Sequence, residues 1–423
     1  MLKDTNSTLD LLKARMRQRD VYLWGARQDG LSMCKVLERQ GYRPVGFIDS
    51  SLSLQGKTVL NYPVFPPDAL LSTAGSAKPY IIITSAFYAD EIAHRCAQAG
   101  LTTPDDFITH SEIQCFDYQI DISGVCNLKC ISCPRGNFSP QPAAGFMDAG
   151  TYEKVLRKII SEDPFVGAVS LYNWGEPLLN PHLPEMITFS NELGVHTALS
   201  SNLSLQMDFT DVVRSRPTWF RVSVSGFGSN YEITHTGGRW ELFLANLYRL
   251  RELMDQYHPE LQVEVFYHIY RNNNGEDFHK MKKLCEELGF TLRFRHAALA
   301  PLENVEAVIE GRPLSAGAMR TRELQILSVE EAMALAVAQK DRPCFYERCL
   351  WITWDLKVSQ CMEWFTPGLT LVPGDFLHTP LSEIAAARRD NDFCRRCKER
   401  AIHRCYMVYG DEKLVHERRS VTL

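Results

Sequence analysis

The chain has 423 residues, a formal net charge of −5 and a hydrophobic content of 45%. This length exceeds one ordinary hydrophobic core, so two or three domains are expected. Lys and Arg form no basic run, which argues against a nucleic-acid partner. No apolar stretch reaches 18 residues and the N-terminus lacks an apolar segment, so we expect a cytoplasmic protein with no membrane partner.

The thirteen cysteines are the most informative part of the composition. Nine of them fall into two groups, at 126–133 and 344–405. An odd count without a secretion signal argues against a disulfide framework, so the grouped thiols favour metal ligation. The other four are expected to be buried as small apolar residues. These are Cys34, Cys96, Cys115 and Cys285.

Residues 1–112 are predicted to form a Rossmann-like α/β domain. Apolar runs at 21–24, 45–48 and 80–83 are typical of parallel strands separated by helices. Arg27 occupies a glycine position of the dinucleotide fingerprint. The stretch from VYLWGAR to GFIDSSLSLQGKTVLNYPVF resembles truncated Rossmann-like domains that accompany sugar-modifying enzymes. A docking or structural role for the domain is the alternative interpretation.

Residues 113–300 are predicted to form a partial (β/α)6 TIM-like barrel, because six strand-like runs alternate with helical patterns. The runs are at 118–122, 168–172, 196–199, 220–224, 263–267 and 292–295. The C-terminal ends of such strands carry the chemistry. Residues 301–340 are expected to be a helical connector, and residues 341–423 a small C-terminal cluster-binding domain.

The first cysteine group follows the first barrel strand directly. Cys126, Cys130 and Cys133 lie within eight residues of loop. Three thiolates can hold a cuboidal [4Fe–4S] cluster and leave one iron open to another ligand. Structural zinc is the alternative, although it requires four ligands and no histidine is near in the sequence.

The residues around this group resemble those of the radical SAM (S-adenosylmethionine) superfamily. CNLKCISCPRG is similar to the C-x3-C-x2-C signature, and Gly175-Glu176-Pro177 after the second strand is similar to the GEP motif. HTALSSNL at 196–203 resembles the stretch that usually reads TNG, but here it ends in Ser201-Asn202-Leu203. The residue before the third cysteine is usually aromatic and is Ser132 here.

The resemblance implies a SAM site beside an open cluster. Gly175, Glu176 and Pro177 would bind SAM, with Glu176 on its ammonium group because an ionised carboxylate only accepts hydrogen bonds. Ser201 and Asn202 would contact the ribose or the carboxylate. The alternative for Glu176 is a helix N-terminal acid. One electron, from a flavodoxin- or ferredoxin-type donor, would cleave SAM to methionine and a 5′-deoxyadenosyl radical that abstracts hydrogen.

The second cysteine group resembles the SPASM/twitch auxiliary-cluster domains, through CFYERCLWITWDLKVSQC and a later CRRC. That resemblance implies one auxiliary [4Fe–4S] cluster on Cys344, Cys361, Cys394 and Cys397. It leaves Cys349 and Cys405 unassigned. The hairpin turn of these domains commonly has glycine after the aspartate, where this chain has Leu356 after Asp355. A zinc ribbon is the alternative, because zinc accepts the same four thiolates.

Three reactions are compatible with these motifs. The first is oxidation of a small polar substrate (an aminosugar, cyclitol or nucleotide sugar) with the auxiliary cluster as electron acceptor. The second is a redox-neutral epimerisation in which Cys349, Cys405 or Cys285 returns hydrogen, and the third is peptide modification. A redox sensor is a non-enzymatic alternative that would not need a GEP motif. Strand-end residues expected near a substrate are Tyr172, Asn173, Ser223, Ser225, Tyr267, His268, Arg293, Arg295 and His296.

Overall fold

The structure is a computed structural model, and it describes residues 5–52, 54–68, 78–85, 88–113, 116–137, 141, 143–366, 368–389 and 391–410. It divides into two compact units. The first comprises residues 1–117, 154–169 and 189–196, and the second residues 118–153, 170–188 and 197–423. None of the helices in the described ranges is long and apolar enough to cross a membrane.

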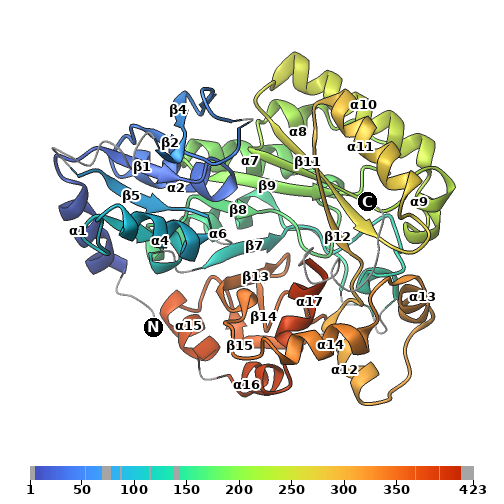
Figure 1. Cartoon of the computed structure of the whole chain (residues 1–423). Coiled ribbons are helices and arrows are strands. Elements are labelled where there is room, and N and C mark those ends of the chain that lie inside the picture. Colours follow the sequence, from blue (N-terminus) through green and yellow to red (C-terminus); the bar gives the residue numbers. More distant parts are fainter. Residues whose placement is uncertain are drawn as a thin grey trace. The chain divides into compact units, whose positions relative to one another are not determined.

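The first unit holds a six-stranded sheet in the order β3-β4-β2-β1-β5-β6 (Figure 1). Its strands are β1 (Val21–Trp24), β2 (Gly46–Ile48), β3 (Thr58–Val59), β4 (Tyr62–Phe65), β5 (Tyr80–Ile83) and β6 (Phe107–Thr109). Its helices include α1 (Thr5–Met16), α2 (Gln28–Arg39), α4 (Ala89–Gln98) and the short η1 (His110–Glu112). All residues of β5 are buried, as in a parallel strand covered on both faces.

Hydrogen bonds to the Asp49 side chain stabilise the turn after β1. The Asp49 carboxylate accepts the Ala26 N–H at 2.9 Å and the Ser51 N–H at 2.8 Å. In a dinucleotide fold the acidic residue near this position binds a ribose hydroxyl. Here the Asp49 carboxylate accepts these two backbone hydrogen bonds within the domain.

A nine-stranded sheet is the second architectural element, in the order β12-β11-β10-β9-β8-β7-β13-β14-β15. The barrel strands are β7 (Asp117–Asp121), β8 (Ala168–Ser170), β9 (His196–Ser201), β10 (Trp219–Val224), β11 (Gln262–Ile269) and β12 (Thr291–His296). Their helices are α5 (Pro134–Asn137), α6 (Ala149–Glu162), η2 (Pro177–Leu179), α7 (Leu183–Glu192), α8 (Thr210–Arg214), α9 (Ser229–Thr234), α10 (Trp240–Tyr257) and α11 (Glu276–Leu288). The six predicted strands are therefore present, and the partial-barrel prediction is confirmed.

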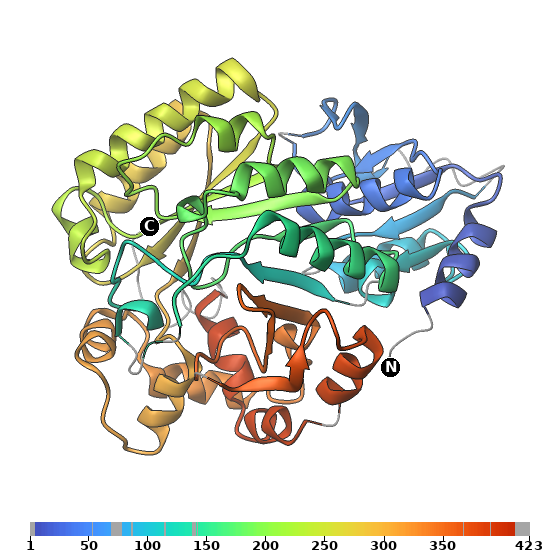
Figure 2. The same ribbon diagram turned by 180° about the vertical axis from the view of Figure 1, so that it is seen from behind.

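The strands β9 to β12 run parallel, so their carboxyl ends lie at one edge. Helices α10 and α11 cover one face of these strands, as both ribbon views show (Figures 1 and 2). Tyr267 and Phe294 pack against Phe278 of α11, with ring centroids 5.6 and 5.0 Å apart. Side chains that alternate with Tyr267 and Phe294 face the opposite side of the sheet.

The C-terminal residues extend this same sheet. Strands β13 (Cys349–Thr353), β14 (Lys357–Ser359) and β15 (Thr370–Asp375) pair antiparallel and follow β7 in the strand order. The remaining helices are α12 (Leu302–Ile309), α13 (Ala316–Leu324), α14 (Val329–Val337), η3 (Phe345–Arg348), α15 (Leu381–Arg389), α16 (Asp392–Glu399) and α17 (Ile402–Gly410). The sequence pattern did not predict that the C-terminal strands would join the barrel sheet.

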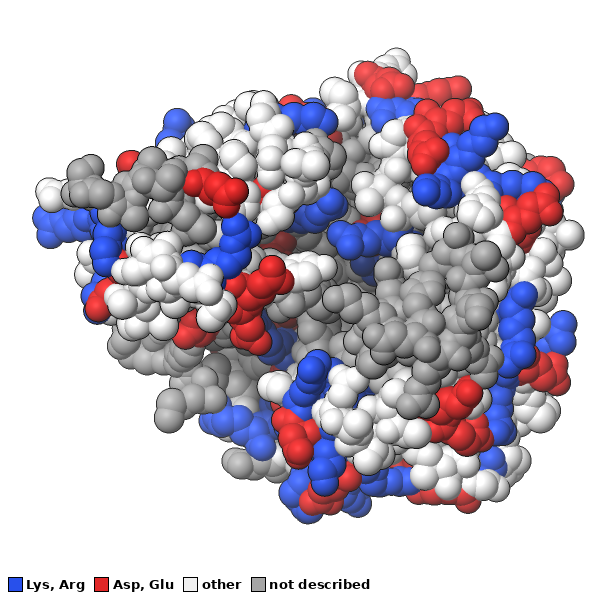
Figure 3. All heavy atoms as spheres, in the orientation of Figure 1, with Lys and Arg blue, Asp and Glu red and all other residues white. Residues whose placement is uncertain are grey.

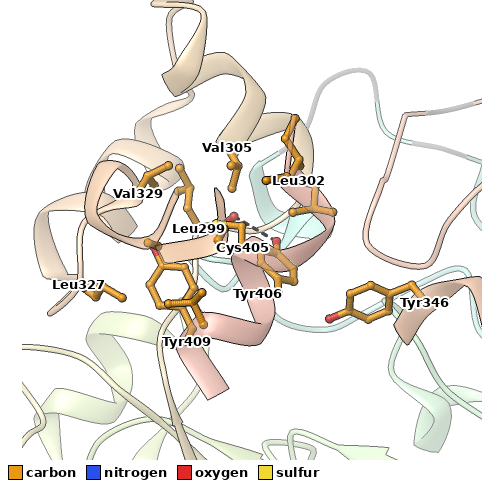
Figure 4. Close-up of a cluster of buried hydrophobic side chains, with 14 of the residues drawn as sticks. Leu299, Leu302, Val305, Leu327, Val329, Tyr346, Cys405, Tyr406 and Tyr409 are labelled. Carbon is orange, nitrogen blue, oxygen red and sulfur yellow. Dashed lines mark hydrogen bonds between the residues drawn. The ribbon is translucent and has the colours of Figure 1, made fainter. Parts of the chain in front are cut away.

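Helices α12, α13, α14 and α17 share one hydrophobic core (Figure 4). Leu302, Val305 and Val329 pack there against α17. The Tyr406 hydroxyl donates a hydrogen bond to the Leu299 carbonyl at 3.0 Å. This core positions the second cysteine group beside the end of β12. Elsewhere, Cys34, Cys96 and Cys285 are buried as expected, and Cys115 lies outside the described residues.

Candidate functional site

The loop after β7 carries the first cysteine group. The backbone N–H groups of Lys129 and Ile131 donate to the carbonyls of Thr236 and Thr234 at 2.9 and 3.1 Å. The Cys133 N–H bonds to the Cys130 carbonyl, and α5 begins at the next residue. These bonds fix a short loop that holds its three cysteines on one side of the sheet edge.

Gly175 lies against this loop in a place that only glycine can occupy. A Cβ atom there would be 1.7 Å from the Ser123 carbonyl oxygen. The backbone N–H groups of Trp174 and Gly175 donate to the two oxygens of Asp121 at 3.3 Å each. Burial raises the pKa of Asp121 to about 6. The close approach brings the loop after β8 onto the cysteine loop.

Glu176 follows at once and is 2% exposed. Its carboxylate accepts the Leu178 N–H at 3.1 Å and the Asn202 N–H at 2.9 Å. Burial raises the pKa of this carboxyl to about 7, against the opposing effect of these hydrogen bonds. Its negative charge also raises the pKa of Cys126, so the carboxylate lies close to the thiol.

The end of β9 completes this group. The Asn202 side-chain amide donates to Asn127 Oδ1 at 3.0 Å and to Cys126 Sγ at 3.8 Å. The Ser201 hydroxyl accepts the Leu203 N–H at 3.0 Å, and a hydrogen bond from Ser201 lowers the pKa of Glu176. The structure therefore brings together Glu176, Ser201 and Asn202 beside Cys126, with Pro177 buried at the start of η2.

Leucine stands at both positions where the family resemblance leads one to expect glycine. Leu203 has φ of 47° and Leu356, in the β13–β14 turn, has φ of 67°. Both lie in the left-handed region that glycine adopts without steric cost. Both leucines thus adopt a backbone conformation that glycine would adopt without strain.

Ser132 has an aromatic neighbour from another part of the chain. A hydrogen bond between Ser132 and Tyr270, after β11, opposes the effect of burial, which raises the pKa of Tyr270 to about 12. Tyr270 is fully buried and packs with Ile131 and Ala297. An aromatic ring therefore lies next to the cysteine loop although the residue before Cys133 is serine.

The first three thiols form a set that suits an anionic cluster. Burial raises the pKa of Cys126 to about 12 and that of Cys133 to about 11, and it raises the pKa of Cys130 well above its usual value. The Arg135 guanidinium lowers the pKa of Cys126 and Cys133. Thiols bind metals as thiolates, so loading would release protons, and the Arg135 cation favours the charged thiolates.

Four cysteines of the second group line one pocket. Its lining includes Cys344, Cys361, Cys394 and Cys397, together with the cationic Arg388 and Lys398. The Gln360 amide donates to Cys394 Sγ at 3.6 Å. Four thiols and two cations around one pocket fit an anionic four-thiolate cluster. Among the described residues, no three His, Cys, Asp or Glu side chains converge on a point that could hold a single metal ion.

Cys349 and Cys405 do not line this pocket. They are 3% and 0% exposed and belong to the hydrophobic core around α14 and α17. Burial raises the pKa of Cys405 to about 12. Figure 4 shows Cys405 among the aliphatic and tyrosine side chains of that core.

Trp354 of the hairpin after β13 joins the two cysteine regions. Its ring covers Gly145, where a Cβ atom would approach the ring to 2.3 Å. Its indole nitrogen donates to the Ala143 carbonyl at 3.3 Å. Gly124, at the start of the cysteine loop, bonds through its N–H to the Gly145 carbonyl at 2.8 Å.

The strand-end residues divide between the two faces of the sheet. Tyr267 is fully buried on the α11 side, where its hydroxyl donates to the Asn273 carbonyl at 2.9 Å. It therefore belongs to the core and not to the inner face. His268 and Arg295 pair in register on the opposite, inner face. Sequence reasoning missed Arg221 and Glu264 on that face, because they lie within the strands and not at their ends.

Residues 120–285 match the family model described as the Radical SAM superfamily. That match includes Cys126, Cys130 and Cys133 and also Glu176. Proteins of this superfamily carry a [4Fe–4S] cluster and bind SAM. A search of curated proteins found no match.

Several solved structures share part of the fold. Native anSMEcpe with bound AdoMet is 15% identical, with 68% of this chain and 87% of that chain covered and a TM-score of 0.44. BtrN in complex with AdoMet and 2-DOIA is 15% identical (72% and 89% covered, TM-score 0.39). Streptococcus suis SuiB bound to precursor peptide SuiA is 13% identical (75% and 74% covered, TM-score 0.46).

Proposed function

Because residues 120–285 of this chain are a radical SAM domain, we propose that the protein cleaves SAM reductively and removes a hydrogen atom from a small polar substrate, with net oxidation. When bound, the cluster and SAM supply a reducing electron and a 5′-deoxyadenosyl radical. The protein's own residues bind, orient and shield the reactants. The proposed ligands of this cluster are Cys126, Cys130 and Cys133.

The arrangement of Glu176, Asn202 and Cys126 is the observation that supports this proposal most. Glu176 places a buried carboxylate beside the thiol, and its two hydrogen bonds fix the direction of its remaining lone pairs. A carboxylate is suited to an ammonium group, which supports the proposed SAM contact. Gly175, Pro177 and Ser201 are proposed to shape the same site, since they hold Glu176 against the loop.

The second cysteine pocket supports oxidation as the outcome. Cys344, Cys361, Cys394 and Cys397 are the proposed ligands of an auxiliary [4Fe–4S] cluster, with the Arg388 cation lining the same pocket. A cluster with four protein ligands has no open iron for a substrate, so its proposed role is to accept an electron. An external flavodoxin- or ferredoxin-type protein is the proposed source of the first electron.

Epimerisation would need a thiol that can return a hydrogen atom to the substrate. Cys349, Cys405 and Cys285 are the candidate donors, but all three are buried, the first two in a hydrophobic core. Their burial favours oxidation over epimerisation. A peptide substrate remains an outcome that product analysis would reveal.

The proposal is tested with anaerobically reconstituted protein, dithionite and SAM. We expect 5′-deoxyadenosine from the wild type and none from a Cys126→Ala/Cys130→Ala/Cys133→Ala variant. Cys285→Ala is the matched control, since Cys285 is buried in α11 away from both groups. An equal yield from the triple variant would overturn the proposal.

Deuterium distinguishes oxidation from epimerisation. In D₂O an oxidation returns no solvent deuterium to the attacked carbon, whereas an epimerisation with a cysteine donor does. Deuterium at that carbon without net oxidation would exclude the dehydrogenase outcome.

A further inference from the structure

Three charged side chains form a compact group on the inner face of strands β10 to β12. Glu264 pairs with Arg221 through Nε at 3.0 Å and with Arg293 through Nε at 3.3 Å. The Glu264 side chain is 5% exposed, whereas those of Arg221 and Arg293 are 30% and 49% exposed. Two guanidinium groups thus share one buried carboxylate, which leaves a net positive charge.

The register of the strands explains this grouping. Arg221 lies opposite Glu264, and Arg293 lies opposite Phe266, two residues further along β11. The Arg221 guanidinium also covers the Phe266 ring at 4.6 Å from its centroid. Arg221 and Arg293 contact different oxygens of the Glu264 carboxylate, each through its Nε atom.

Arg295, two residues after Arg293 on β12, adds a third arginine to this face. It lies opposite His268, and its terminal nitrogen donates to the Tyr406 carbonyl at 2.7 Å. Its Nε is buried without a hydrogen-bond partner among the residues that the structure describes. Burial, together with the charges of Arg295, His235 and Arg221, lowers the pKa of His268 to about 3, so this histidine is neutral and adds no charge.

The cationic face adjoins the proposed SAM site. His235 lies close enough to His268 to affect its pKa. Its neighbours Thr234 and Thr236 accept hydrogen bonds from the N–H groups of Ile131 and Lys129 in the cysteine loop. Figure 3, in the orientation of Figure 1, shows Lys and Arg atoms at the surface of the part that holds β11 and β12.

Resting on the proposed function, we infer that the substrate carries an anionic oxygen group, a phosphate ester or a carboxylate, bound by Arg221, Arg293 and Arg295. Planar guanidinium groups bind such groups through paired hydrogen bonds. A cationic aminosugar would meet net positive charge at this face. Among the small polar substrates considered, the geometry therefore favours an anionic one such as a nucleotide sugar.

The inference is tested by calorimetric titration of the reconstituted protein with SAM present. The probes are inorganic pyrophosphate, malonate and glucosamine. We expect saturable binding of pyrophosphate, malonate or both, which distinguishes phosphate from carboxylate recognition, and none of glucosamine. Arg293→Gln and Arg295→Gln should each weaken anion binding about tenfold or more, as for a lost charge-assisted hydrogen bond. Arg249→Gln, in an exposed pair on α10, should leave it unchanged.

The Glu264→Gln variant distinguishes two interpretations of the arginine group: a binding site for an external anion, and a purely structural ion-pair network. If the arginines bind an external anion, removing their internal carboxylate strengthens anion binding. If the group is only structural, Glu264→Gln and Arg293→Gln weaken binding alike, which would overturn the inference. Binding of glucosamine alone would also overturn it. The 5′-deoxyadenosine yield without any substrate is measured on the same samples, so failure of SAM cleavage is recognised separately.

Discussion

The indole nitrogen of Trp174 donates a hydrogen bond to the backbone carbonyl of Met362, 3.1 Å away. Trp174 immediately precedes Gly175 and Glu176, and Met362 immediately follows Cys361. The Trp174 ring also meets Phe365 edge to face, at 6.0 Å between centroids. The loop that carries Glu176 therefore contacts the segment that follows Cys361, a proposed ligand of the auxiliary cluster.

This link predicts a specific effect of removing the indole donor. Trp174→Phe keeps an aromatic ring against Phe365 but leaves the Met362 carbonyl without its partner, at a cost of about 1 kcal/mol. Hydrogen exchange at residues 360–366 should become faster. Trp351→Phe is the control, because the Trp351 indole nitrogen has no partner in the described part of the chain. Equal exchange in the two variants would contradict the link.

Leu203 and Leu356 both have a left-handed backbone conformation, but their side chains are buried to different degrees. Replacing each of them with glycine should therefore change the stability differently. Leu356→Gly relieves about 1 kcal/mol of backbone strain and removes a side chain that is only partly buried. Leu203→Gly relieves similar strain but removes a fully buried side chain, which costs about 2–3 kcal/mol or more. We expect a clearly lower thermal midpoint for Leu203→Gly than for Leu356→Gly. The reverse order would show that strain dominates at Leu203.

The iron content of single variants should distinguish the proposed ligands among the six C-terminal cysteines from the two cysteines in the core. Cys394→Ala removes a proposed ligand and should lower the iron content by about four atoms per chain. Cys405→Ala removes a buried core group and should keep all the iron while lowering stability slightly. Iron and sulfide analysis of matched preparations measures this. Loss of a cluster in Cys405→Ala alone would reassign the ligands.

The buried His268 predicts an acid-dependent loss of stability. Its pKa is lowered to about 3 by burial and by Arg295, His235 and Arg221, whereas an unfolded histidine has a pKa of about 6.5. Below pH 6.5 the unfolded chain takes up a proton that folded His268 does not, so stability falls as the pH decreases. The thermal midpoint of the wild type should therefore drop more than that of His268→Gln between pH 7.5 and 5.5. An equal drop would show that His268 is protonated in the folded protein.

Much of the proposed cluster chemistry was visible in the sequence because it depends on local spacing. The loop that carries Cys126, Cys130 and Cys133 and the glycine before Glu176 are short motifs whose geometry is set by neighbouring residues. The six barrel strands were also visible, since apolar runs of this length alternate with helical patterns.

Arg293 and Arg295 were expected near the substrate, but their grouping with Arg221 and Glu264 on one face was not visible, because it depends on strand register. Arg221, Glu264 and Arg293 come from three strands, and a shift of one residue would turn each to the other face. Tyr267 was expected near the substrate for the same reason and lies in the core instead. The Ser132–Tyr270 contact likewise joins residues far apart in the chain, so the departure at Ser132 could not be interpreted from the sequence alone.

The most direct test of the proposed SAM site is low-temperature electron paramagnetic resonance of a Cys344→Ala/Cys394→Ala variant, in which the proposed auxiliary ligands are removed. The dithionite-reduced protein should show one [4Fe–4S] signal, and adding SAM should change its shape because SAM binds the open iron beside Glu176. A signal that SAM leaves unchanged, in protein with a full first cluster, would contradict the account.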